Sequence, residues 1–183
     1  MEAANHRHQT GKEDENMSTP PAPAAAAAAP VTPPVAYLDA AYRHMTDAEA
    51  LYSSQRLANA GQLYGFVAEC GLKALLMACG VQPGADGGIP SRLPLPEKKP
   101  HPMRTHVPLL MTNITADFHL IPDGPQATKY LSFVPNRHNF NDWLIDHRYW
   151  REAALPFASV DQWRAAAREV TNMLDQAKQD GVL

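Results

Sequence analysis

The sequence predicts an all-α fold, an up-and-down bundle of four to five helices, and three observations indicate it. Apolar residues recur at helical spacing near both ends of residues 36–183, a stretch between them is apolar on nearly every side, and no stretch has a convincing strand pattern. The chain has 183 residues, of which 45% are hydrophobic, enough for the core of one domain. We therefore predict one helical domain over residues 36–183.

The first 35 residues have a different composition. They are polar at first and then rich in proline and alanine. Proline removes backbone donors and alanine offers little area to bury, so this stretch lacks the means to build a core. We predict a disordered tail over residues 1–35.

Two long helices are expected first. Helical spacing begins at Ala36 and ends near Ser54, and a second helix covers residues 58–79 before Gly80 stops it. Because this second helix is apolar all round, we place it in the middle of the bundle. Gly61 and Gly65 lie four apart on it and are expected to let a neighbouring backbone approach closely.

Three further helices are predicted in the second half of the chain. One covers residues 106–119 with Thr105 as its cap, a shorter one covers residues 126–133, and Ser159 caps a final helix that ends near Asp180. Residues 81–104 hold six prolines and are predicted to form a long loop. Residues 135–154 lack clean periodicity.

Charge and motif content exclude several classes. The net charge of -3 argues against binding long nucleic acid through many phosphates, although a local basic patch is compatible with it. The chain has no apolar run of about 18 residues, the length needed to span a membrane. It also has no metal-binding motif and no nucleotide-binding loop motif, so we expect no metal and no cofactor. Cys70 and Cys79 are expected to be buried, reduced thiols in a cytoplasmic protein.

Three stretches resemble one known family. Residues 53–76 (SSQRLANAGQLYGFVAECGLKALL), 105–110 (THVPLL) and 140–149 (FNDWLIDHRY) are similar to the HEPN (higher eukaryotes and prokaryotes nucleotide-binding) superfamily. The resemblance implies an up-and-down bundle that often dimerises. It also implies one of two roles, a metal-independent ribonuclease of toxin and defence systems or a non-catalytic partner of a nucleotidyltransferase.

Active members of that superfamily carry an arginine, four to six further residues and then a histidine. The histidine works as general base or acid, and the arginine stabilises the phosphorane. Here Arg137 is followed by His138, but His147 lies ten positions later, so the motif is absent as written. A displaced site would have to draw on the candidates Arg137, His138, His147 and Arg148. Alternatively, the aromatic residues around them close the bundle and the charges pair with nearby carboxylates.

A second set of candidates would bind rather than catalyse. Glu69 and Lys73 are spaced four apart in the most apolar helix, where ionised groups need partners. We expect Glu69 to reach Arg148, His106 or Tyr149. Tyr149 and Arg151 are candidates for stacking a base and contacting a phosphate. The competing interpretation is a buried polar network without a ligand.

These observations leave three functional hypotheses. The first is a non-catalytic nucleotide- or RNA-related binding or regulatory partner in a bacterial defence or toxin-antitoxin type system. The second is a metal-independent endoribonuclease toxin, and the third is a structural oligomerisation domain. The resemblance implies a homodimer, and it suggests a nucleotidyltransferase or antitoxin as partner.

Overall fold

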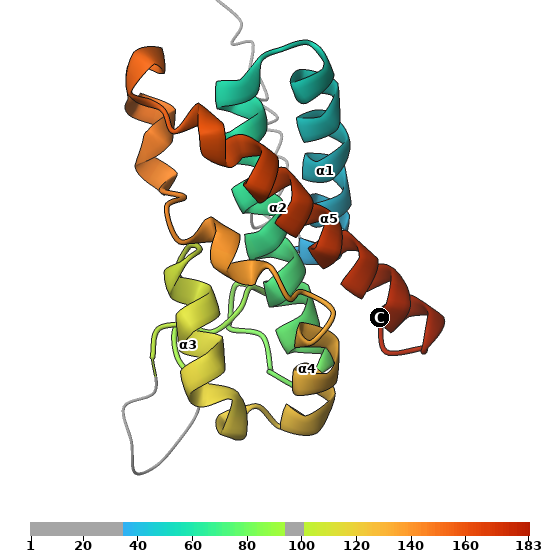
Figure 1. Cartoon of the computed structure of the whole chain (residues 1–183). Helices are drawn as coiled ribbons and strands as arrows, with labels where there is room; N and C mark the ends of the chain where they lie inside the picture. The colour runs from blue at the N-terminus through green and yellow to red at the C-terminus, as the bar shows by residue number, and fades with distance from the viewer. Residues whose placement is uncertain (1–34, 94–100) are drawn as a thin grey trace, which may run out of the picture. The chain divides into compact units, whose positions relative to one another are not determined.

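The described part of the chain is all-helical. A computed structural model describes residues 35–93 and 101–183, and within these ranges it contains no strand (Figure 1). The α-helices are α1 (Tyr37–Ser53), α2 (Leu57–Ala78), α3 (Leu109–Asp117), α4 (Gly124–Leu131) and α5 (Phe157–Gln179). Short 3-10 helices form η1 (Phe118–Leu120), η2 (Arg137–Phe140), η3 (Ile145–Tyr149) and η4 (Glu152–Ala154). The predicted tail lies outside the described residues except for residue 35, as do residues 94–100 of the predicted loop.

Helix α2 lies in the core, as its composition predicts. In Figure 1 it runs beside α1, to which a short turn joins it, and α5 crosses both. Most α2 side chains are buried, whereas α5 buries one stripe at helical spacing. That stripe consists of Val160, Trp163, Ala166, Ala167, Val170, Met173, Leu174 and Ala177.

The end of α2 is a Schellman motif built on Gly80. Gly80 has a φ of 90°, a left-handed conformation that only glycine adopts at little cost. Its N–H donates to the Met77 carbonyl, and the Val81 N–H donates to the Leu76 carbonyl, both over 3.1 Å. The predicted stop at Gly80 is thereby confirmed.

Three helix starts differ from the sequence prediction. The third helix begins at Leu109 and not after Thr105, because the backbone of the residue before Pro108 is pushed out of the helical region. Helix α4 begins two residues earlier than expected, since the Asp123 carboxylate accepts the Gln126 N–H over 3.0 Å and caps it. Helix α5 starts at Phe157, and the hydroxyl of Ser159 donates to Asp142 and does not act as its cap.

Gly61 and Gly65 each make room for a different indole ring, Trp163 at Gly61 and Trp143 at Gly65, and the expectation of a neighbouring backbone was wrong. A Cβ atom on Gly65 would lie 1.9 Å from Cε2 of Trp143, which is fully buried. The Trp143 Nε1–H also donates to the Gly61 carbonyl over 3.0 Å. The irregular segment between α4 and α5 is thus fastened to α2 through one side chain.

Both cysteines are free thiols, and burial raises the pKa of each to about 11. Among the described residues, no group of three or more histidine, cysteine or carboxylate side chains is placed to hold a metal ion. In the same ranges, no helix combines the length and apolar character needed to cross a membrane.

Candidate functional site

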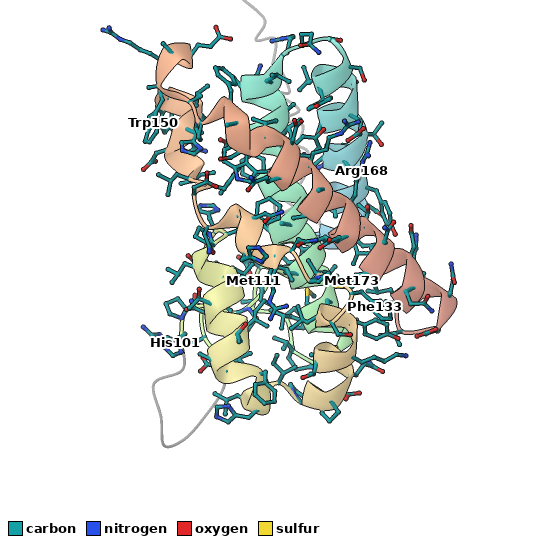
Figure 2. The ribbon with its side chains drawn as sticks, in the orientation of Figure 1. His101, Met111, Phe133, Trp150, Arg168 and Met173 are labelled. Carbon is teal, nitrogen blue, oxygen red and sulfur yellow. The ribbon has the colours of Figure 1, made fainter. Side chains whose placement is uncertain are left out.

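The predicted catalytic residues divide between two cavities. Arg137 and His138, on η2, line a groove of about 450 Å³ along α3, together with Met111. His147 and Arg148, on η3, line a different cavity at the start of α2. Figure 2 shows the separation, with Trp150 beside the N-terminal half of α5 and Met111 on α3. The structure therefore brings His147 and Arg148 together but does not place Arg137 in the same cavity.

Arg137 has a local structural contact. Its Nη1 donates to the Val134 carbonyl over 3.3 Å, which holds the turn that follows α4. His138 beside it is exposed. The displaced pair of Arg137 and His147 considered from the sequence is not assembled in this conformation.

The second cavity has a volume of about 380 Å³, and we call it the α2 N-terminal pocket. The start of α2 forms one wall, and η3 with η4 forms another. In Figure 1 these elements are the teal end of α2 and the orange segment. The lining residues are Gln55, Arg56, Ala58, Asn59, Gln62, His147, Arg148, Trp150, Glu152 and Leu155.

Positive charge gathers in the α2 N-terminal pocket. The first N–H groups of a helix lack intrahelical partners and carry the positive end of its dipole, and no side chain caps α2 at Arg56. Arg56 and Arg148 add two guanidinium groups. Among the described residues, Glu152 is the one acidic residue that lines the pocket. Within the described ranges, Arg56, Arg148 and Glu152 take part in no ion pair.

His147 is a buried, neutral group in this pocket. Its ring lies 4.6 Å from the Trp150 ring and 5.6 Å from the Trp163 ring, centroid to centroid. Burial lowers its pKa below the ordinary 6.5, although the nearby carboxylates of Asp142 and Asp146 oppose this shift. The Nδ1 atom lies 3.4 Å from the Leu144 N–H and accepts it, so the proton of the neutral ring is on Nε2.

Gln62 connects the two walls of the pocket. Its Nε2 donates to the Ile145 carbonyl of η3 over 3.5 Å. Its Oε1 is buried and has no hydrogen-bond partner among the described residues. An unsatisfied buried oxygen is unusual and is typically completed by a water or by a ligand.

The predicted stacking residues lie at the rim. Tyr149 is 73% exposed and Trp150, which also lines the pocket, is 43% exposed. The Arg148 guanidinium lies 4.6 Å from the centroid of the Tyr149 ring. Arg151 is exposed next to them.

Glu69 and Lys73 form a separate polar network in the middle of α2. The Lys73 Nζ donates to Glu69 Oε1 over 2.6 Å, and His106 Nδ1 lies 2.6 Å from Glu69 Oε2. Both α2 side chains are buried, whereas His106 is half-exposed. Of the three partners expected for Glu69, only His106 contacts it within the described residues. Arg148 and Tyr149 lie on η3, and Arg148 lines the pocket at the start of α2.

Sequence reasoning missed the α2 side of the pocket. Arg56, Asn59 and Gln62 were not among the candidates, and Trp150 entered only as one of several aromatic residues. One signal was present, since Asn59 and Gln62 are polar residues three apart at the start of an otherwise apolar helix. A helix that begins at an arginine without a capping residue was a second signal.

Three comparisons with known proteins complete the description of the site. No family model, no curated protein and no solved structure matches the chain. The family resemblance of the sequence therefore stays a prediction, and functional inference depends on the geometry of the site.

Proposed function

We propose that this chain is a HEPN-like module, built as an up-and-down bundle, that binds a nucleotide or an RNA phosphate without cleaving it. The carrying observation is the position of Arg56 and Arg148 at the uncapped N-terminus of α2. The two guanidinium groups are repelled by the positive N-terminal end of the α2 dipole, and a bound anion would offset that repulsion. A phosphate group fits this demand because both guanidinium groups and free N–H groups bind its oxygens.

The other lining residues favour a nucleotide over a bare anion. Trp150 offers a partly exposed indole on which a base can stack. The amides of Asn59 and Gln62 supply hydrogen-bonding groups of the kind that read base edges. A volume of about 380 Å³ lies within the usual range of about 300–1,000 Å³ for small-molecule sites.

The ribonuclease hypothesis is the second candidate, because His147 and Arg148 share the pocket. A general base must present a free nitrogen lone pair to the substrate hydroxyl. In His147 the lone pair on Nδ1 already accepts the Leu144 N–H, and the other nitrogen carries the proton. This arrangement supports hydrogen-bond donation to a ligand more than proton abstraction.

A regulatory role would need a partner surface, and exposed apolar side chains offer one. Leu109, Phe118 and Phe133 are each about half-exposed on the α3 and α4 part of the structure. A homodimer, a nucleotidyltransferase or an antitoxin remains the proposed partner, and an oligomerisation domain remains the third hypothesis. Light scattering of the purified chain tests the homodimer directly.

The binding proposal is tested by titrating the protein with AMP and following tryptophan fluorescence. Trp143 and Trp163 are buried, so Trp150 is the reporter that a ligand in the pocket would quench. We expect Arg56→Ala and Arg148→Ala each to weaken binding about 10- to 100-fold, because each removes a charge-assisted hydrogen bond.

The control is Arg43→Ala, which removes an exposed arginine of α1 outside the pocket and should leave the affinity unchanged. The Trp150→Phe protein should lose the signal while isothermal calorimetry still detects AMP. Equal affinity in the wild type and in both pocket variants would overturn the proposal.

The absence of cleavage is tested by incubating the protein with total RNA in EDTA. We expect the RNA to stay intact. Cleavage that disappears in His147→Ala or Arg148→Ala would replace the binding proposal with the ribonuclease hypothesis.

A further inference from the structure

The α2 N-terminal pocket is small compared with a polynucleotide. Its volume of about 380 Å³ is near the lower end of the range for small-molecule sites, which suits one nucleotide. Its walls come from the start of α2 on one side and from η3 and η4 on the other. A nucleic acid chain that enters it must therefore leave the rest of its length outside.

Tyr149 lies at the rim of the pocket, where the second nucleotide of a bound strand would lie. Tyr149 follows Arg148 directly and is the most exposed large hydrophobic residue of the described ranges, at 73%. An aromatic ring left in water is a stacking surface for a base of any identity. The ring does not line the pocket, so it is available to a group outside it.

Arg148 connects the two places. It lines the pocket, and its guanidinium lies 4.6 Å from the Tyr149 ring centroid. This contact positions the ring beside the pocket while its other face can receive a base. Arg151, exposed two residues further on, adds a positive charge for the phosphate that joins the two nucleotides.

We infer that the pocket takes the phosphorylated end of a single nucleic acid strand, with the terminal nucleotide inside and the next base stacked on Tyr149. This inference rests on the proposed nucleotide-binding function and adds the class of ligand. The strand end carries a phosphate monoester, whose charge at pH 7 is about -1.5 to -2 and exceeds that of an internal diester. The two arginines and the uncapped helix end match this higher charge.

The test compares AMP with the dinucleotides pApA, ApAp and ApA, in ribose and deoxyribose forms, by calorimetry with the full chain. We expect the better of pApA and ApAp to bind about tenfold more tightly than AMP, since one base–aromatic stack contributes about 1–3 kcal/mol. ApA should bind about tenfold more weakly than that dinucleotide because it lacks the monoester. The tighter sugar form identifies the strand as RNA or DNA.

Tyr149→Ala should remove the advantage of the dinucleotide over AMP when both affinities are measured with that variant. Phe133→Ala, which truncates an exposed aromatic residue just after α4, is the matched control and should keep the wild-type ratio of the two affinities. Dinucleotides that bind no better than AMP, a gain that survives in Tyr149→Ala, or ApA equal to pApA would each overturn the inference. In those cases AMP binding would still support the proposed function, whereas loss of AMP binding would remove both.

Discussion

The indole N–H of Trp143 donates to the backbone carbonyl of Gly61 over 3.0 Å, and this bond joins the irregular segment to the core helix. The ring is fully buried and makes an edge contact with Phe66, 5.9 Å between centroids. Because η3 begins two residues after Trp143, the position of this indole constrains where His147 and Arg148 face α2. The α2 N-terminal pocket therefore depends on packing one turn away from it.

We predict that Gly65→Ala destabilises the protein and disturbs the pocket. The new Cβ would lie 1.9 Å from the Trp143 ring, so the indole must move. Alanine normally stabilises a helix relative to glycine by about 1 kcal/mol, yet overpacking costs about 1–3 kcal/mol or more. Urea unfolding should show a net loss of stability, and AMP affinity should fall.

The control substitution is Gly84→Ala, outside the helices, where the nearest atom to a new Cβ would be a carboxylate oxygen of Asp86 at 3.3 Å. Its unfolding midpoint should stay near that of the wild type. A Gly65→Ala protein that is more stable than the wild type would show that the indole does not occupy this space.

Periodicity predicted the long helices because their burial repeats along the sequence itself. The observed bounds of α1 and α2 and the end of α5 lie within about one residue of the predicted ends, and the polar exceptions Glu69 and Lys73 were visible in α2. The starts of α3 and α4 depended on single residues, Pro108 and Asp123, whose effects a periodic pattern does not contain.

The candidate site could be predicted only in part. Its η3 side was found because histidine, arginine and aromatic residues cluster within residues 137–151. Its α2 side was not, because Arg56 and Gln62 share a cavity with Arg148 only through the packing of segments far apart in the sequence. The Trp143–Gly61 hydrogen bond, which joins α2 to the segment before η3, has no periodic signature.

Replacing Glu69 alone should lower the free energy of unfolding more than replacing both Glu69 and Lys73. Glu69→Leu leaves the Lys73 ammonium, 6% exposed, without its carboxylate, and an unpaired buried charge costs about 3–5 kcal/mol. In Glu69→Leu/Lys73→Met both charges are gone, so most of that loss should be recovered. Chemical unfolding of Glu69→Leu, Lys73→Met and the double variant measures the difference. A double variant as unstable as Glu69→Leu would contradict this account.

Glu49 should make the free energy of unfolding fall at acidic pH. Its carboxylate accepts hydrogen bonds from Arg164, Arg168 and Tyr64, and the Arg164 bond is the largest cause that lowers its pKa from 4.5 to about 2. A pKa lowered by folding means that the carboxylate stabilises the fold above pH 4.5. This contribution is lost as the pH falls from 4.5 through about 2. Since the side chain is partly exposed, we expect about 1–2 kcal/mol.

Glu49→Gln should therefore be less stable than the wild type at pH 7, and the difference should shrink towards pH 2. Urea unfolding at several pH values measures it. Asp47→Asn is the control, because Asp47 is exposed on the same helix and takes part in no hydrogen bond or ion pair within the described residues. A difference between Glu49→Gln and wild type that is constant over the whole pH range would exclude the Arg164 pairing as its cause.

His147 should titrate below pH 6.5 and carry its neutral proton on Nε2. Burial between two indole rings lowers its pKa, and the Leu144 N–H occupies Nδ1. Because folding lowers this pKa, the stability is complete above pH 6.5. It falls as the pH drops through the folded-state value, where protonation breaks the Leu144 bond. Nitrogen-15 NMR of the imidazole measures both the pKa and the tautomer. A proton on Nδ1 would leave the Nε2 lone pair free for a general base and would favour the ribonuclease hypothesis over simple binding, and titration above pH 6.5 would contradict the effect of burial.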